Sequence, residues 1–255
     1  MGLCCEAANS HICQMILKNT NPILMNRSFS GLMILLLSAG LMPALLACGG
    51  SSNSGTEIPT SERFQMGMTA LEDEDYLEAE QHFEIILLQD PASEYADDAQ
   101  YYLGEAHYRN EDFKLAAFHF NRVVRDFPSS IHYKRAMFLT GECYYQVSPQ
   151  YERDQKETEN AIKQFQLFKR AFANDSLTTV AQERITGLMT KLARREYSVA
   201  EHYLNNDEFK AAEIYFQRVV DRYPGTEYYA KAQRGLEEAA AGQQKRAEEQ
   251  ALSRK

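Results

Sequence analysis

Cysteine is scarce in the part of the chain that carries a regular pattern. Of the five cysteines, at positions 4, 5, 13, 48 and 143, only Cys143 falls after residue 60. A lone cysteine can form neither an intrachain disulfide framework nor a paired-cysteine metal site there. Its place in a helical pattern indicates a small buried apolar residue rather than a nucleophile.

Catalytic motifs are missing as well. The sequence has no HExxH, no phosphate-binding loop and no GxSxG, and its six histidines are scattered without the neighbours that a metal site or a triad needs. We therefore expect no enzymatic activity, no metal and no dissociable cofactor. A hydrolase would require folding to gather a catalytic cluster in a closed pocket.

Positive charge is also in short supply. Lysine and arginine number 27 against 36 aspartates and glutamates, which gives a formal net charge of -9. Nucleic-acid binding needs a cationic surface, so this balance argues against a nucleic-acid partner. Lys191, Arg194 and Arg195 form a local basic face, which is either solvated surface or a contact for an acidic partner.

A helix-pair pattern is what the chain does contain. Over residues 97–128, apolar residues return at three- and four-residue steps in two halves, as in two amphipathic helices. Small residues at Gly104 and Ala116 let the two helices approach closely, and Phe120 fills the space between them. Pro128 stops the second helix. This spacing is that of a tetratricopeptide repeat (TPR).

The pattern recurs along the chain. Small residues equivalent to Gly104 stand 37 positions away on either side, at Gly67 and Gly141, and again at Ala200, and a fifth copy begins at Glu227. One repeat cannot bury its apolar face, but a stack can. We predict an all-α fold, a tetratricopeptide-like α-solenoid of four to five helix pairs over residues 60–241.

Two segments depart from this regularity. An insertion at residues 146–159 is expected to be a solvated loop or, alternatively, a partner-docking feature. Residues 178–204 predict a helix longer than those of the first two repeats, or two helices joined at a kink, with Gly187 as a weak interruption. The polar tail at residues 242–255 is expected to fray.

The N-terminal residues are typical of a targeting segment. Residues 1–47 contain Arg27, an apolar run and then small residues, and the fit improves if translation starts at Met25. Residues 45–48 (LLAC) resemble the lipobox of bacterial lipoproteins, which implies diacylglycerol and N-acyl lipid on Cys48. Gly49 implies sorting to the outer membrane. The alternative is an ordinary signal anchor or an inert thiol. Residues 48–59 predict a lipidated, flexible tether.

Candidate binding residues lie on the first helix of each repeat, which a solenoid presents on its concave side. Aromatic rings with carboxylates beside them suit an extended or turn-shaped peptide that has aromatic anchors. The alternative is that these rings pack between neighbouring repeats. The candidates for this substrate-peptide groove are Phe64, Met68, Tyr101, Glu105, Tyr108 and Phe138.

Several strings together resemble one family. Residues 192–203 (LARREYSVAEHY), residues 221–232 (DRYPGTEYYAKA) and the run Arg153–Gln155 resemble BamD (YfiO/ComL) proteins, lipoproteins of the outer-membrane β-barrel assembly (BAM) machine. One departure is that residues 173–176 (ANDS) stand where the third repeat should end in proline.

The resemblance implies a non-catalytic scaffold, lipid-anchored at the periplasmic face of the outer membrane. Its expected partners are the periplasmic domains of a BamA-like barrel protein, other BAM lipoproteins and unfolded outer-membrane proteins. The N-terminal repeats would receive the unfolded substrates, and the BamA contact would lie near Arg194, Arg195, Tyr197 and Glu201. The alternative is a TPR lipoprotein that coordinates cell-wall synthesis or envelope division.

Overall fold

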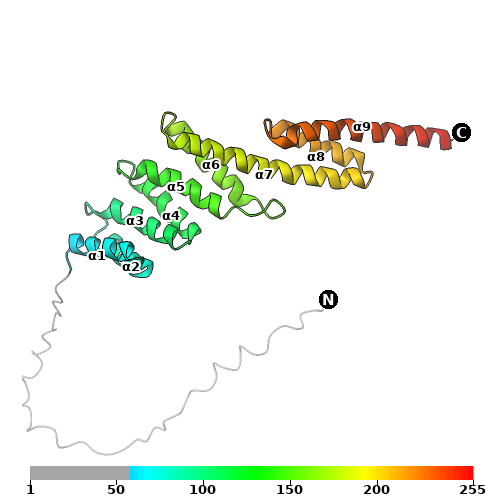
Figure 1. Cartoon of the computed structure of the whole chain (residues 1–255). Coiled ribbons are helices and arrows are strands. Elements are labelled where there is room, and N and C mark those ends of the chain that lie inside the picture. Colours follow the sequence, from blue (N-terminus) through cyan, green and yellow to red (C-terminus); the bar gives the residue numbers. More distant parts are fainter. Residues whose placement is uncertain (1–57, 255) are drawn as a thin grey trace, which may run out of the picture. The chain divides into compact units, whose positions relative to one another are not determined.

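Residues 58–254 are described by the computed structural model, and this part of the chain is helical without strands (Figure 1). Residues 1–57, which include the expected signal peptide, Cys48 and nearly all of the tether, lie outside the described range. The helices are α1 (Thr60–Glu72), α2 (Tyr76–Gln89), α3 (Ala96–Arg109), α4 (Phe113–Asp126), α5 (Tyr133–Gln146), α6 (Lys156–Ala171), α7 (Leu177–Asn205), α8 (Phe209–Arg222) and α9 (Glu227–Ser253).

Each helix packs against the helices that precede and follow it in sequence, which confirms the predicted TPR-like solenoid. A phenylalanine from the second helix of each pair forms the core, and Phe83, Phe120, Phe165 and Phe216 are at most 1% exposed. A Cβ atom added at Gly104 would lie only 2.8 Å from the ring of Phe120. The small residue is therefore what lets the paired helices close around the ring, whose burial contributes about 1.5–3 kcal/mol.

Short turns within the repeats share an unusual backbone conformation. Glu74, Glu111 and Asp207 have φ angles of 63°, 61° and 59°, in the left-handed region. Each stands between the first and second helix of its repeat. This conformation costs a residue with a side chain roughly 1–2 kcal/mol. Three independent copies show that the tight helix-to-helix turn requires it.

The boundary between the third and fourth repeats has Ala173 where the other repeats have proline, and Asp175 follows two residues later. Its carboxylate accepts a hydrogen bond from Nζ of Lys134 at 2.7 Å and from the backbone N of Leu177 at 2.9 Å. The hydrogen bond from Lys134 holds the pKa of Asp175 below its usual value, with a further contribution from the backbone N–H. The Asp175 carboxylate thus satisfies the backbone N–H of the first residue of α7, close to the point where the other repeats have proline.

Helices α7 and α9 are both longer than the regular ones. Residues 178–204 lie in one continuous helix, so the longer-helix alternative is confirmed. Helix α9 continues to Ser253, so the tail that was expected to fray from residue 242 is helical. Gly242 admits the ring of Phe209 against its backbone, and Arg246 donates to the carbonyl oxygen of Asp207 at 2.8 Å. These tertiary contacts hold a segment that its polar composition alone does not stabilise.

Candidate functional site

The aromatic rings predicted to line a substrate groove are core residues. Phe64, Tyr101 and Phe138 are only 8%, 9% and 5% exposed. Phe138, for example, packs its ring centroid 5.4 Å from that of Phe168 in an edge-on arrangement. Phe64 and Tyr101 meet rings of the next repeat, as in the alternative interpretation, whereas the ring of Phe138 packs on phenylalanines of its own repeat. The three rings offer no open surface to a peptide in this structure.

Tyr101 illustrates why its position was misleading. Its ring stacks on His132 of the next repeat, with centroids 4.0 Å apart and planes 7° from parallel. His132 is held in turn by a contact of 2.7 Å from its Nε2 to Oδ1 of Asp98. Burial, reinforced by Glu105, raises the pKa of the Tyr101 hydroxyl. Tyr101 thus packs between the second and third repeats rather than lining an open groove.

The other three groove candidates keep part of their surface open. Met68, Glu105 and Tyr108 are half-buried. Nε of Arg109 donates to the Glu105 carboxylate at 3.0 Å, and the Tyr108 ring meets Phe113 edge-on, with centroids 5.4 Å apart. These three residues remain the candidates for a peptide contact.

The third repeat has residues equivalent to Glu105 and Tyr108, and one of them forms an ion pair that sequence reasoning missed. Nε of Arg184 donates to Oε1 of Glu142 at 3.1 Å, and its guanidinium carbon lies 4.3 Å from the ring centroid of Tyr145. Glu142 and Tyr145 occupy the same repeat positions as Glu105 and Tyr108. Arg184 comes from the first half of α7, to which the repeat pattern assigns no position, so no signal in the sequence pointed to it.

The predicted partner residues lie on the second half of α7. Arg194, Arg195 and Glu201 are exposed, whereas Tyr197 is half-buried against the rings of Phe216 and Tyr228. Burial raises the pKa of Tyr197 to about 12, with further contributions from the hydrogen bond to Glu201 and its charge. Arg194 and Arg195 are free to meet a partner, while Tyr197 largely supports the core.

The insertion between α5 and α6 is exposed at Gln150 and at residues 152–154, as expected of a solvated loop, but a buried polar residue also orders it. Nε2 of Gln155, a residue only 1% exposed, donates to the carbonyl oxygens of Gln150 at 2.7 Å and Arg153 at 2.9 Å. Its Oε1 accepts from Oγ1 of Thr158 at 2.8 Å. One buried amide thus closes the loop on itself.

A chain of hydrogen bonds ties this loop to α7. Nζ of Lys191 donates to Oγ of Ser148 at 2.8 Å, and Ser148 lies 2.6 Å from Oγ1 of Thr158, which in turn donates to Gln155. The guanidinium carbon of Arg194 lies 4.1 Å from the ring centroid of Tyr151 at the tip of the loop. The inserted residues therefore stand beside the predicted partner surface.

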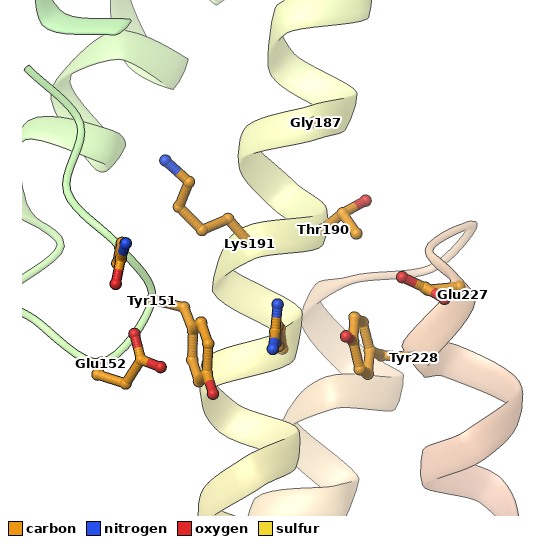
Figure 2. Close-up of a pocket in the computed structure, with 9 residues that line it drawn as sticks. Tyr151, Glu152, Gly187, Thr190, Lys191, Glu227 and Tyr228 are labelled. Carbon is orange, nitrogen blue, oxygen red and sulfur yellow. The ribbon is translucent and has the colours of Figure 1, made fainter. Parts of the chain in front are cut away.

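A cleft results between the loop, α7 and the start of α9 (Figure 2). Its volume is about 550 Å³, within the range of ligand sites. We call it the loop cleft. Figure 2 shows Tyr151 on the loop side and Tyr228 on the α9 side of α7. The lining residues are Gln150, Tyr151, Glu152, Gly187, Thr190, Lys191, Arg194, Glu227 and Tyr228.

Comparison with protein families identifies the chain. Residues 56–254 match the model of the YfiO family, described as outer membrane lipoprotein. The chain belongs to this family. YfiO-family membership makes it a lipoprotein of the outer membrane and agrees with the strings at residues 192–203 and 221–232.

Other comparisons add little to the YfiO assignment. No curated protein matches the sequence. A solved structure described as a candidate protein-binding protein from Bacteroides ovatus aligns at 14% identity with a TM-score of 0.34, covering 73% of this chain and 98% of that one. A score this low supports no inference.

Metal-ligating and nucleophilic side chains within residues 58–254 of the YfiO-family chain are the next feature to consider. No group of three or more metal-ligating side chains comes together in this range. Nor does any described helix have the length and apolar character to span a bilayer. Cys143 is fully buried, and burial raises the pKa of its thiol. A protonated buried thiol is a packing residue rather than a nucleophile.

Proposed function

We propose that this YfiO-family protein is a non-catalytic scaffold of the β-barrel assembly complex, binding the periplasmic domains of a BamA-like protein and unfolded outer-membrane proteins. The observation that carries the proposal is the family match over residues 56–254, which spans the whole solenoid. Stacked helix pairs present an extended surface, which suits binding of other proteins.

The anchor in this proposal is covalent lipid on Cys48, a residue outside the described range. Each buried methylene of an acyl chain contributes about 0.8 kcal/mol, so a cysteine carrying several chains is anchored stably. The proposed location is the periplasmic face of the outer membrane. The LLAC string at residues 45–48 supports this anchor.

Two surfaces divide the work in the proposal. Unfolded barrel proteins would contact the open members of the predicted groove, Met68, Glu105 and Tyr108, because the buried rings cannot take part. The BamA-like protein and the other lipoproteins of the complex would contact the second half of α7, where Arg194 and Arg195 are exposed.

The experiment that tests the function is capture of the mature protein from its own membranes in mild detergent, with mass spectrometry of its partners and of its N-terminal peptide. We expect a BamA-like barrel protein together with a lipidated Cys48 peptide. Recovery of cell-wall enzymes without a barrel protein would overturn the proposal in favour of a lipoprotein of envelope division.

A further inference from the structure

Two cations in the loop cleft lack a carboxylate partner among the described residues. Lys191 and Arg194 stand one turn apart on α7, and within residues 58–254 neither lies within 4.0 Å of an acidic side chain. Lys191 donates to the neutral Ser148, and Arg194 stacks on Tyr151 at 4.1 Å. Neither contact neutralises the positive charge.

The geometry of Arg194 suits recognition of a carboxylate. A guanidinium that stacks its face on an aromatic ring keeps its N–H groups at the edge, where they form a fork that matches two carboxylate oxygens. Arg194 is also exposed, so an incoming group can reach that edge. Lys191 adds positive charge, but its Nζ already donates to Ser148 of the insertion loop. Arg194 is therefore the residue that can contact a ligand carboxylate directly.

Acidic residues at the rim set a limit on the ligand. Glu152 is exposed, and Glu227 is paired with Lys231 at 3.5 Å, with its own side chain 62% exposed. Like charges repel, so these carboxylates disfavour phosphate-rich ligands such as nucleic acid. One carboxylate on an otherwise neutral ligand meets the two cations and incurs less of this repulsion than a ligand with several negative charges.

The shape of the cleft suits an extended chain. A Cβ atom added at Gly187 would meet nothing within 4 Å, so α7 presents bare backbone to the cleft at this point. Figure 2 shows the rings of Tyr151 and Tyr228 on the two sides of α7, with Thr190 between Gly187 and the rings along the helix. Tyrosine rings at two sides offer flat contact area for a peptide.

We propose that the loop cleft binds an extended segment of another protein through one aspartate or glutamate side chain, whose carboxylate pairs with Arg194. The inserted residues of the third repeat supply one wall of this site, which explains why a polar loop is tied so firmly to α7. The inference rests on the proposed function only because Arg194 belongs to the surface assigned to the BamA-like partner.

Peptide pools test the proposal even though the partner segment is unidentified. Full-length protein in detergent would be immobilised and offered seven-residue peptides, acetylated and amidated at their ends, with neutral random residues around a central Glu or Gln. We expect about tenfold greater retention of the Glu pool. In the Arg194→Gln variant the two pools should be retained equally.

Matched variants separate this site from general charge. Arg195→Gln removes an exposed neighbouring charge that does not line the cleft, and it should keep the Glu preference. Gly187→Leu fills the cleft without changing charge and should reduce retention of the Glu pool. A third pool, with central Gln and a free C-terminal carboxylate, should behave like the capped Gln pool.

The outcomes are decisive in both directions. Equal retention of the Glu and Gln pools by the unaltered protein, a preference only for the free C-terminus, or the same loss in Arg195→Gln would each overturn the inference. Failure of the proposed function looks different, because a Glu preference could persist while membranes yield no barrel protein. Recovery of the barrel protein without a Glu preference would remove the inference alone.

Discussion

The regular repeats, α1 to α4, differ from the irregular region, which is the loop before α6 together with the first half of α7, in how they use polar residues and glycine. In the regular region, Gly104 faces the buried ring of Phe120, and the buried Gln100 and His119 bond each other. In the irregular region, Gly187 faces open space. The buried Gln155 there organises a loop that borders a cleft. In the regular repeats the space between paired helices is filled, whereas the insertion forms one wall of the open loop cleft.

The largest expected effect concerns acid stability of the regular region. His119 is 8% exposed, and burial, with added repulsion from His107 and Arg122, lowers its pKa to about 4. Nε2 of Gln100 donates to its Nδ1 at 2.9 Å, so the folded state favours the neutral ring. The unfolded state takes up this proton near pH 6.5, whereas the folded state takes it up only near pH 4. The stability that comes from keeping the His119 ring neutral is therefore fully present above pH 6.5 and is lost as the pH falls toward 4.

Between pH 7 and pH 4 the free energy of unfolding should fall through His119 by at most about 3 kcal/mol. Thermal unfolding followed by circular dichroism from pH 7 to pH 4 would measure it. His119→Gln should flatten this dependence, whereas His202→Gln, which replaces an exposed histidine, should leave it intact. An unchanged pH profile in His119→Gln would remove the assignment.

The second prediction attacks the irregular region at its centre. Gln155→Ala deletes three hydrogen bonds, which leaves the carbonyl oxygen of Gln150 with only the backbone N–H of Arg153 and removes the amide donor from the carbonyl of Arg153. We expect a local loss of about 2 kcal/mol. Hydrogen exchange should accelerate in residues 147–155 while α1 to α4 keep their protection. Glu152 lies in the same loop but is exposed, so Glu152→Ala serves as the control and should change neither stability nor hydrogen exchange appreciably.

The third prediction tests the closed inter-helix space. In Gly104→Ala the new methyl group would lie 2.8 Å from the ring of Phe120, which is fully buried and cannot withdraw easily. Overpacking of this kind costs about 1–3 kcal/mol, partly offset by the better helix propensity of alanine. Denaturant unfolding should show a net loss of about 1 kcal/mol. A more stable variant would contradict the close packing.

The smallest effect is expected at the matched glycine of the irregular region. Gly187→Ala adds a methyl group where nothing lies within 4 Å, so only the helix propensity changes. The variant should gain up to about 1 kcal/mol, measured by the same unfolding experiment. If Gly104→Ala and Gly187→Ala shifted stability in the same direction, the contrast between the two regions would fail.

Sequence reasoning succeeded where a feature depends on neighbours close in the chain. The pairing of Gly104 with Phe120 was predictable because both lie within one helix pair. The row of aromatic positions was also visible, but the burial of Tyr101 was not, because His132 of the next repeat covers it. The insertion was located by its offset, but its order depends on Lys191, 43 residues after Ser148.

The sequence by itself determined the helices and their pairing, because hydrophobic periodicity and small residues act over one or two turns. The family came from a resemblance of particular strings, at residues 192–203 and 221–232. The tertiary structure alone decided which side chains face solvent and which meet each other. Arg184 meets Glu142 and Arg194 meets Tyr151 only because α7 packs beside the third repeat and its inserted loop. Exposure and charge pairing depend on how neighbouring repeats stack. The stacking is set by contacts between segments that lie far apart in the chain.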